Sequence, residues 1–226
     1  MLQARLLNSL AKVFLDREPQ APVLRRGTVL RGETFSCQLA FQSSERIQNP
    51  LQVACSGSLA PLARLRRIGH LPVGNIGECL RPGAETLGFE RRKPGLFPDV
   101  LFTNIDFLHA NAGTWHSFWI DLPIPANFAA GKHELVLQLH NTVEREKPAF
   151  RESRPVKLSL EVIPATLPEQ TLRHTEWFHC DGLAMAYGLE PWSEPYWELL
   201  ATYFRHYTAH GMNMLLTPIF TPPLDT

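Results

Sequence analysis

The sequence predicts a mainly β protein, in which an N-terminal antiparallel β-sandwich is followed by a truncated α/β segment of the TIM-barrel type. Three observations predict this. Several segments within residues 1–165 alternate apolar and polar residues, as half-buried strands do. A strand–helix–strand pattern follows, which is typical of parallel α/β folds. Charge and aromatic content change abruptly between the two parts.

The strands of the first part are predicted from period-two alternation. It is clearest in residues 34–42, 133–139 and 156–162. In the last of these, Leu158 and Leu160 lie on one face while Lys157 and Glu161 lie on the other, so we expect both leucines to be buried. Residues 51–55 and 115–122 are further predicted strands. The stretch 70–112 is rich in Gly, Pro and Asn, and its role is not assigned by the sequence.

A domain boundary is predicted near residue 165. Residues 1–165 carry 20 basic and 15 acidic residues, whereas residues 166–226 carry 2 basic and 7 acidic ones. All four tyrosines and three of the five tryptophans also lie in the second part. Pro164 and Pro168 end the preceding strand and stiffen a short linker. We therefore expect a sandwich domain at 1–165 and a second domain at 166–226.

The second part is predicted to be the first βαβ unit of an incomplete (β/α)₈ barrel. Residues 171–179 and the apolar run 212–220 are the expected strands. Between them, Ser193 is a helix N-cap, Glu194 and Pro195 suit the first turn, and Gly211 suits the residue after the C-cap. A complete barrel needs on the order of 250 residues. The chain is therefore expected to hold only the beginning of its second domain.

Composition excludes several classes of function. The 22 Lys and Arg balance 22 Asp and Glu, which argues against a nucleic-acid-binding or anionic-membrane surface. No apolar run approaches the roughly 18 residues of a membrane helix, and no signal peptide is recognised, so the expected compartment is the cytoplasm. The four cysteines show no CxxC spacing. No metal site, disulfide framework or cofactor is predicted.

Two segments resemble a known bacterial family. Residues 167–181, which include Trp177-Phe178-His179-Cys180-Asp181, and residues 210–226 are similar to the barrel entry of the domain of unknown function 4091 family, related to glycoside hydrolase family 123. Residues 95–99 and 115–120 resemble its N-terminal sandwich. The resemblance implies a glycosidase-like barrel and a carbohydrate substrate. In characterised relatives, an adjacent Asp-Glu pair hydrolyses β-linked N-acetylgalactosamine with help from the substrate's own acetamido group, an exception to the two-carboxylate scheme.

No adjacent Asp-Glu pair occurs in this sequence. The resemblance therefore implies that the catalytic pair lies downstream of residue 226, that no catalytic residue can be named here, and that this chain alone is inactive. The alternative is a non-catalytic carbohydrate-binding or scaffold β-sandwich. A metalloprotein using His174, His179 and Asp181 is a third interpretation, which is disfavoured because residues five apart in a strand point to opposite faces.

Five residues are candidates for binding the substrate. Ligands of parallel α/β folds bind at the carboxyl ends of strands. Aromatic rings and carboxylates suit the apolar C–H face and the hydroxyls of a sugar. Trp177 is equally explained as a core residue, His179 as a structural histidine and Asp181 as a helix cap or turn residue. The sequence identifies neither the sugar and its linkage nor the oligomeric state. The candidates end or follow the two expected strands: Trp177, His179, Asp181, Thr217 and Phe220.

Overall fold

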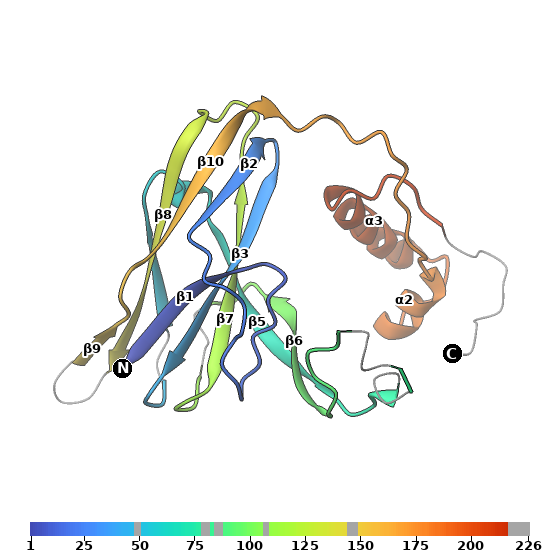
Figure 1. Cartoon of the computed structure of the whole chain (residues 1–226). Helices are drawn as coiled ribbons and strands as arrows, with labels where there is room; N and C mark the ends of the chain where they lie inside the picture. Colours follow the sequence, from blue (N-terminus) through green and yellow to red (C-terminus); the bar gives the residue numbers. More distant parts are fainter. Residues whose placement is uncertain (48–50, 78–81, 84–87, 106–108, 144–148, 217–226) are drawn as a thin grey trace. The chain divides into compact units, whose positions relative to one another are not determined.

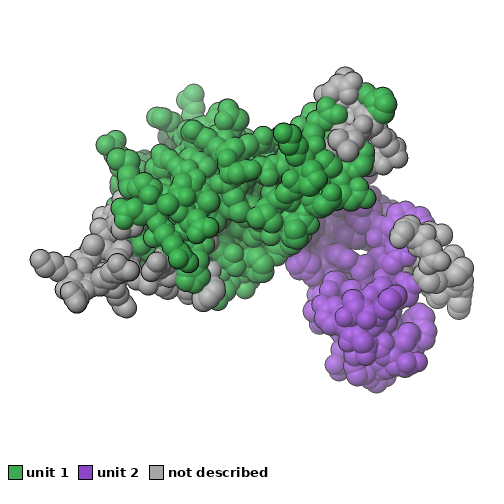
Figure 2. Space-filling view, turned by 90° about the horizontal axis from the view of Figure 1, so that it is seen from below, with its two compact units in different colours: residues 1–167 green, residues 168–226 purple. Residues whose placement is uncertain are grey.

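The chain divides into two compact units, Met1–Leu167 and Pro168–Thr226, which Figure 2 colours separately. Both are seen in a computed structural model that describes residues 1–47, 51–77, 82–83, 88–105, 109–143 and 149–216. Unit 1 is the β-rich part and unit 2 carries two α-helices (Figure 1).

Unit 1 consists of two five-stranded sheets, in the orders β1-β3-β7-β5-β6 and β2-β10-β8-β4, with β9 paired to β8. We call them sheet A and sheet B. Alternating segments of the sequence form three of the strands, β3, β8 and β10, which confirms the predictions for residues 34–42, 133–139 and 156–162. The bounds in sheet A are β1 Leu2–Asn8, β3 Thr34–Ser43, β5 Arg64–Val73, β6 Gly95–Phe102 and β7 Trp115–Pro123. Those in sheet B are β2 Arg26–Arg31, β4 Leu51–Ser56, β8 Gly131–Val143, β9 Ala149–Glu152 and β10 Val156–Thr166.

The predicted antiparallel sandwich contains one parallel strand pair, at an edge of sheet B. β2 pairs with β10 in parallel, with Ser159 opposite Arg26 and Leu160 opposite Gly27. Strands joined by a hairpin must be antiparallel, but β2 and β10 are far apart in the sequence, so their direction is not constrained by a turn. The remaining strand pairs of the two sheets are antiparallel. Unit 1 is therefore a sandwich with one mixed sheet.

The main core lies between the two sheets. Leu39 and Phe118 of sheet A and Leu158 and Leu160 of sheet B belong to one cluster of fully buried side chains, so the expected burial of both leucines is confirmed. At the end of β4, Gly57 lies so close to β8 that a Cβ there would stand 2.4 Å from the carbonyl oxygen of Glu134. With φ at +92°, this position requires glycine on both grounds.

The outer face of sheet A is also covered. Residues 9–18, which we call the N-terminal segment, follow β1 and bring Ala11 and Val13 against Leu7, Ala40 and Trp115. Because apolar groups are buried on both faces here, the middle of β3 is buried at every position from Cys37 to Phe41. Sheet A is therefore a central layer between the main core and the N-terminal segment.

Unit 2 contains α2 (Cys180–Tyr187) and α3 (Glu194–Ala209). α3 begins after Ser193 and is followed by Gly211 in a left-handed conformation, as predicted. α2 was not predicted. Neither α2 nor α3 is long and apolar enough to cross a bilayer, and no other helix occurs among the described residues that could.

The two strands expected in unit 2 are not formed in full. Within residues 171–179 and the described part of 212–220, the structure has an isolated parallel bridge between Trp177 and Leu216. The direction of pairing is the one that a βαβ unit requires. A two-stranded parallel pair without a third strand is marginally stable, which explains why the pairing stays limited to a bridge. The described residues therefore do not show the first βαβ unit of a barrel with two complete strands, and residues 217–220 of the second expected strand lie outside them.

Candidate functional site

The segment that ends in His179 separates its side chains between two faces. Phe178 is 5% exposed and packs among Tyr203, Phe204 and Tyr207. Its neighbours Trp177 and His179 are exposed, Trp177 by 67%. Their rings lie 6.1 Å apart between centroids, with planes only 17° from parallel. Two of the candidate residues are thus brought together, and the core-residue explanation of Trp177 does not hold within the described part of the chain.

Backbone and amide hydrogen bonds hold this segment in place. The N–H of Phe178 donates to the carbonyl oxygen of Leu216 at 2.9 Å. Asn213 spans the neighbouring positions: its Oδ1 accepts from the His174 N–H at 2.8 Å, and its Nδ2 donates to the Leu172 carbonyl at 3.0 Å. Asn213 is therefore a structural residue that fixes residues 172–174 beside the segment from 213 to 216.

Asp181 lies in the first turn of α2, where a negative charge is favourable for the helix dipole. Its Oδ1 accepts from the N–H of Gly182 at 3.0 Å, and its side chain remains exposed. This geometry agrees with the explanation as a turn or cap residue and leaves the second carboxylate oxygen open to solvent. The other two candidates, Thr217 and Phe220, lie outside the described residues.

A second aromatic group occurs where α3 begins. Trp192 is 55% exposed and Trp197 is 46% exposed, and their ring centroids are 5.4 Å apart. Trp192 has φ at +68°, which is rare for a bulky residue and costs backbone energy. Tyr196, buried beside both rings, has its pKa raised by burial, with the Cys180 thiol and the Asp181 carboxylate adding to the effect. The sequence shows that tryptophan is concentrated in this part, but it gives no signal that Trp192 and Trp197 lie side by side.

The metal-binding interpretation gains no support. Among the described residues, no three His, Cys, Asp or Glu side chains are grouped as metal ligands would be. Nε2 of His174 lies 3.1 Å from Oε1 of Glu176, so this histidine is engaged locally. His206 and His210 lie at the end of α3 with ring centroids 4.3 Å apart and planes tilted by 44°, and Nδ1 of His210 lies 2.8 Å from the His206 carbonyl oxygen.

Residues 177–226 match the family model of the glycoside hydrolase 123 catalytic domain. Among solved structures, the chain is similar to a family 123 glycoside hydrolase from Clostridium perfringens, described in connection with glycolipid glycan hydrolysis, with a TM-score of 0.70 and 17% identity. That match covers 95% of this chain but 38% of the clostridial enzyme. At this identity the likeness establishes a shared fold, and the chain spans well under half of the enzyme's length.

Two weaker structural matches are to type I cohesins. The match to a type I cohesin of Pseudobacteroides cellulosolvens covers 67% of this chain and 95% of the cohesin chain, with 12% identity and a TM-score of 0.29. The match to a chain of a type I cohesin–dockerin complex from Clostridium thermocellum covers 72% of this chain and 99% of that chain, with 10% identity and a TM-score of 0.33. These scores are too low to support an argument about function. No curated protein sequence matches the chain.

Proposed function

We propose that this chain is the N-terminal portion of a family 123-type glycoside hydrolase, and that Trp177 and His179 belong to its carbohydrate-binding surface. The proposal is supported by the fact that the family match begins where two exposed rings lie side by side. The match to the catalytic-domain model begins at residue 177, and the exposed, nearly parallel rings of Trp177 and His179 stand at that point of unit 2.

The chemistry of the two side chains supports a sugar ligand. The indole face of Trp177 offers an apolar surface for the C–H face of a pyranose. The imidazole of His179 has one nitrogen that donates and one that accepts when neutral, so it can bond a hydroxyl or an acetamido group. Asp181, which follows two residues later, adds a carboxylate oxygen that accepts hydrogen bonds from sugar hydroxyls. The exposed rings of Trp192 and Trp197 offer further apolar area in the same unit.

A more specific assignment rests on the resemblance of residues 167–181 and 210–226 to the barrel entry of a bacterial family. It comprises membership of the domain of unknown function 4091 family, a β-linked N-acetylhexosaminide as substrate, and a catalytic Asp-Glu pair downstream of residue 226. This chain has no adjacent Asp-Glu pair. We therefore expect it to bind sugar weakly and not to hydrolyse aryl N-acetyl-β-hexosaminides.

The binding surface can be tested with the chain as it is. Methyl N-acetyl-β-D-galactosaminide is titrated into ¹⁵N-labelled protein while the indole N–H signals of the five tryptophans are followed. The Trp177 signal, identified by its absence in Trp177→Phe, is expected to shift saturably. His179→Ala should weaken binding by roughly three- to tenfold, the value of one hydrogen bond.

His174→Ala is the matched control, because His174 is an exposed histidine of the same segment whose ring contacts Glu176 instead; it should leave the affinity unchanged. The absence of a saturable shift at millimolar sugar would contradict the proposal. A shift confined to Trp115 or Trp119, both on β7 of the sandwich, would favour the alternative of a carbohydrate-binding sandwich.

A further inference from the structure

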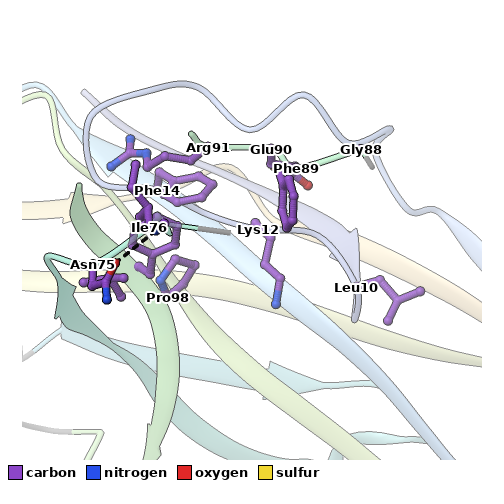
Figure 3. A pocket seen from close by; sticks show the side chains of 13 residues that line it. Leu10, Lys12, Phe14, Asn75, Ile76, Gly88, Phe89, Glu90, Arg91 and Pro98 are labelled. Carbon is purple, nitrogen blue, oxygen red and sulfur yellow. Dashed lines mark hydrogen bonds between the residues drawn. The ribbon is translucent and has the colours of Figure 1, made fainter. Parts of the chain in front are cut away.

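Unit 1 has a cavity of about 680 Å³ beside β6, within the size range of small-molecule sites (Figure 3). Its walls come from three parts of the sequence: the N-terminal segment, the end of β5 with the residues that follow it, and residues 88–98. Residues 73–98 belong to the stretch that the sequence left unassigned. The apolar part of the lining includes Phe14, Val73, Ile76, Phe89, Phe97 and Pro98.

The wall that contains Phe14 is held by several contacts. The rings of Phe14 and Phe97 meet edge to face at 5.5 Å. The guanidinium of Arg91 lies 4.2 Å from the centroid of the Phe14 ring and pairs with Asp16. Arg17 covers the same ring at 4.3 Å and bonds Glu90 at 2.9 Å. These contacts join the N-terminal segment to residues 90–97, so ring contacts and ion pairs hold this wall of the cavity in place.

The polar groups of the cavity are mainly donors. Arg91 and Glu90 are neutralised by Asp16 and Arg17. Lys12 has no hydrogen-bonding or ionic partner in the described part of the chain. Asn75 accepts from the Gly77 N–H with its Oδ1, at 3.0 Å, which leaves its amide NH₂ as a donor. The cavity therefore combines apolar walls with an unpaired ammonium and an amide donor.

We propose that this cavity binds a small amphipathic carboxylate, with its alkyl or aryl body against the phenylalanines and its carboxylate at Lys12. The charge of Lys12 is complementary to this head group, and the lining has few groups that could pair with the many hydroxyls of a sugar. The site lies wholly within unit 1 and is independent of the function proposed for unit 2.

Calorimetric titration of the full chain with octanoate and with 1-octanol tests the proposal, because the two ligands share the apolar body and differ in charge. Both should bind saturably, and octanoate more tightly. Lys12→Gln should weaken octanoate about three- to fivefold, the range of an exposed ion pair, and leave 1-octanol unchanged. Ile76→Asp, which puts a carboxylate into the apolar wall, should weaken both ligands at least about tenfold.

Lys132→Gln is the matched control, because Lys132 is an exposed lysine at the start of β8 that lines no part of the cavity. This variant should change the affinity for neither ligand. Lys12 is itself exposed, so its variant tests the head group without disturbing the core. The proposal is overturned if neither ligand binds saturably at millimolar concentration. It is also overturned if Lys12→Gln leaves the preference for octanoate unchanged, or if Ile76→Asp binds both ligands as the unmodified chain does.

Discussion

At the scale of single residues, burial strongly perturbs the histidine His116 of β7. Its ring stacks on Phe41 with centroids 5.8 Å apart, and its Nε2 lies 3.0 Å from Oγ1 of Thr114. Burial, together with smaller effects of the nearby His70 and Arg67, lowers the pKa of His116 to about 4. The pKa of His70 is also lowered, chiefly by burial. Both histidines are therefore neutral in the folded state at neutral pH.

The lowered pKa predicts acid sensitivity. Between the unfolded pKa of about 6.5 and the folded pKa of about 4, the unfolded state binds the proton and the folded state does not. The contribution of His116 to the free energy of unfolding should be constant above about pH 6.5, fall by about 3 kcal/mol as the pH drops to about 4, and level off below that. Urea unfolding across this range measures it. His116→Gln should flatten the slope, and His206→Gln on exposed α3 should not; equal slopes in all three proteins would contradict the assignment.

At the scale of elements, one buried amide connects the N-terminal segment to sheet A. Gln38 of β3 is 2% exposed. Its Nε2 donates to the carbonyl oxygens of Ser9 at 3.0 Å and Ala11 at 2.7 Å, and its Oε1 accepts from Oγ of Ser117 at 3.2 Å. A polar side chain in the middle of a doubly buried strand is thus satisfied by the segment that covers it.

Gln38→Leu should destabilise unit 1 by about 2–3 kcal/mol, because it keeps the approximate volume but leaves two carbonyl groups and a hydroxyl without their partner. Amide hydrogen exchange of the N-terminal segment should also accelerate. Gln42→Leu is the control. Gln42 lies on the same face of β3, four residues after Gln38, and its Nε2 donates a solvent-exposed hydrogen bond to the Gly113 carbonyl oxygen. Its effect should stay within about 0.5 kcal/mol. Comparable destabilisation by both variants would mean that Gln38 is not an anchor.

Strands were predictable from the sequence where their two faces carry different kinds of residue. β3, β8 and β10 alternate because their inner faces fill the core, and β3 keeps this pattern although both its faces are covered, because its outer face carries the polar Gln38 and Gln42. In β1, Leu6 and Leu7 are both buried, since the N-terminal segment covers the outer face, and the alternation is lost. β5 contains Arg66 and Arg67, which suggest a solvated surface, yet Arg66 pairs with Asp121 and Arg67 lies 4.5 Å over the Phe102 ring.

The two candidate sites also differ in how far the sequence predicts them. The exposure of Trp177 and His179 on one side of Phe178 follows from simple alternation within one segment, which a sequence displays directly. The cavity of unit 1 could not be predicted, because its walls come from residues more than 60 positions apart, such as Lys12 and Phe89. Arg91, half of a basic doublet, joins the wall through its contacts with Phe14, Phe97 and Asp16.

At the scale of the whole molecule, the two units differ greatly in the size of their cores. In unit 1, buried side chains from both sheets form one continuous cluster. In unit 2, the fully buried cluster consists of Phe178, Ala184, Tyr196 and Leu200, and residues 214–216 leave large apolar side chains 38–43% exposed. At about 25 cal/mol per Å² of apolar surface, the difference in buried area favours unit 1 by several kcal/mol.

We therefore predict that the two units unfold separately, with unit 2 the less stable. Native-state hydrogen exchange should protect the amides of Leu39 and Leu158 at least about 100-fold more than those of Phe178 and Met214, a difference of about 3 kcal/mol. The exposed side chains of residues 214–216 favour self-association. Exchange measured at two protein concentrations distinguishes this effect, because association would protect Met214 only at the higher one. Equal protection of all four amides in a monomer would show that the chain unfolds as one cooperative unit.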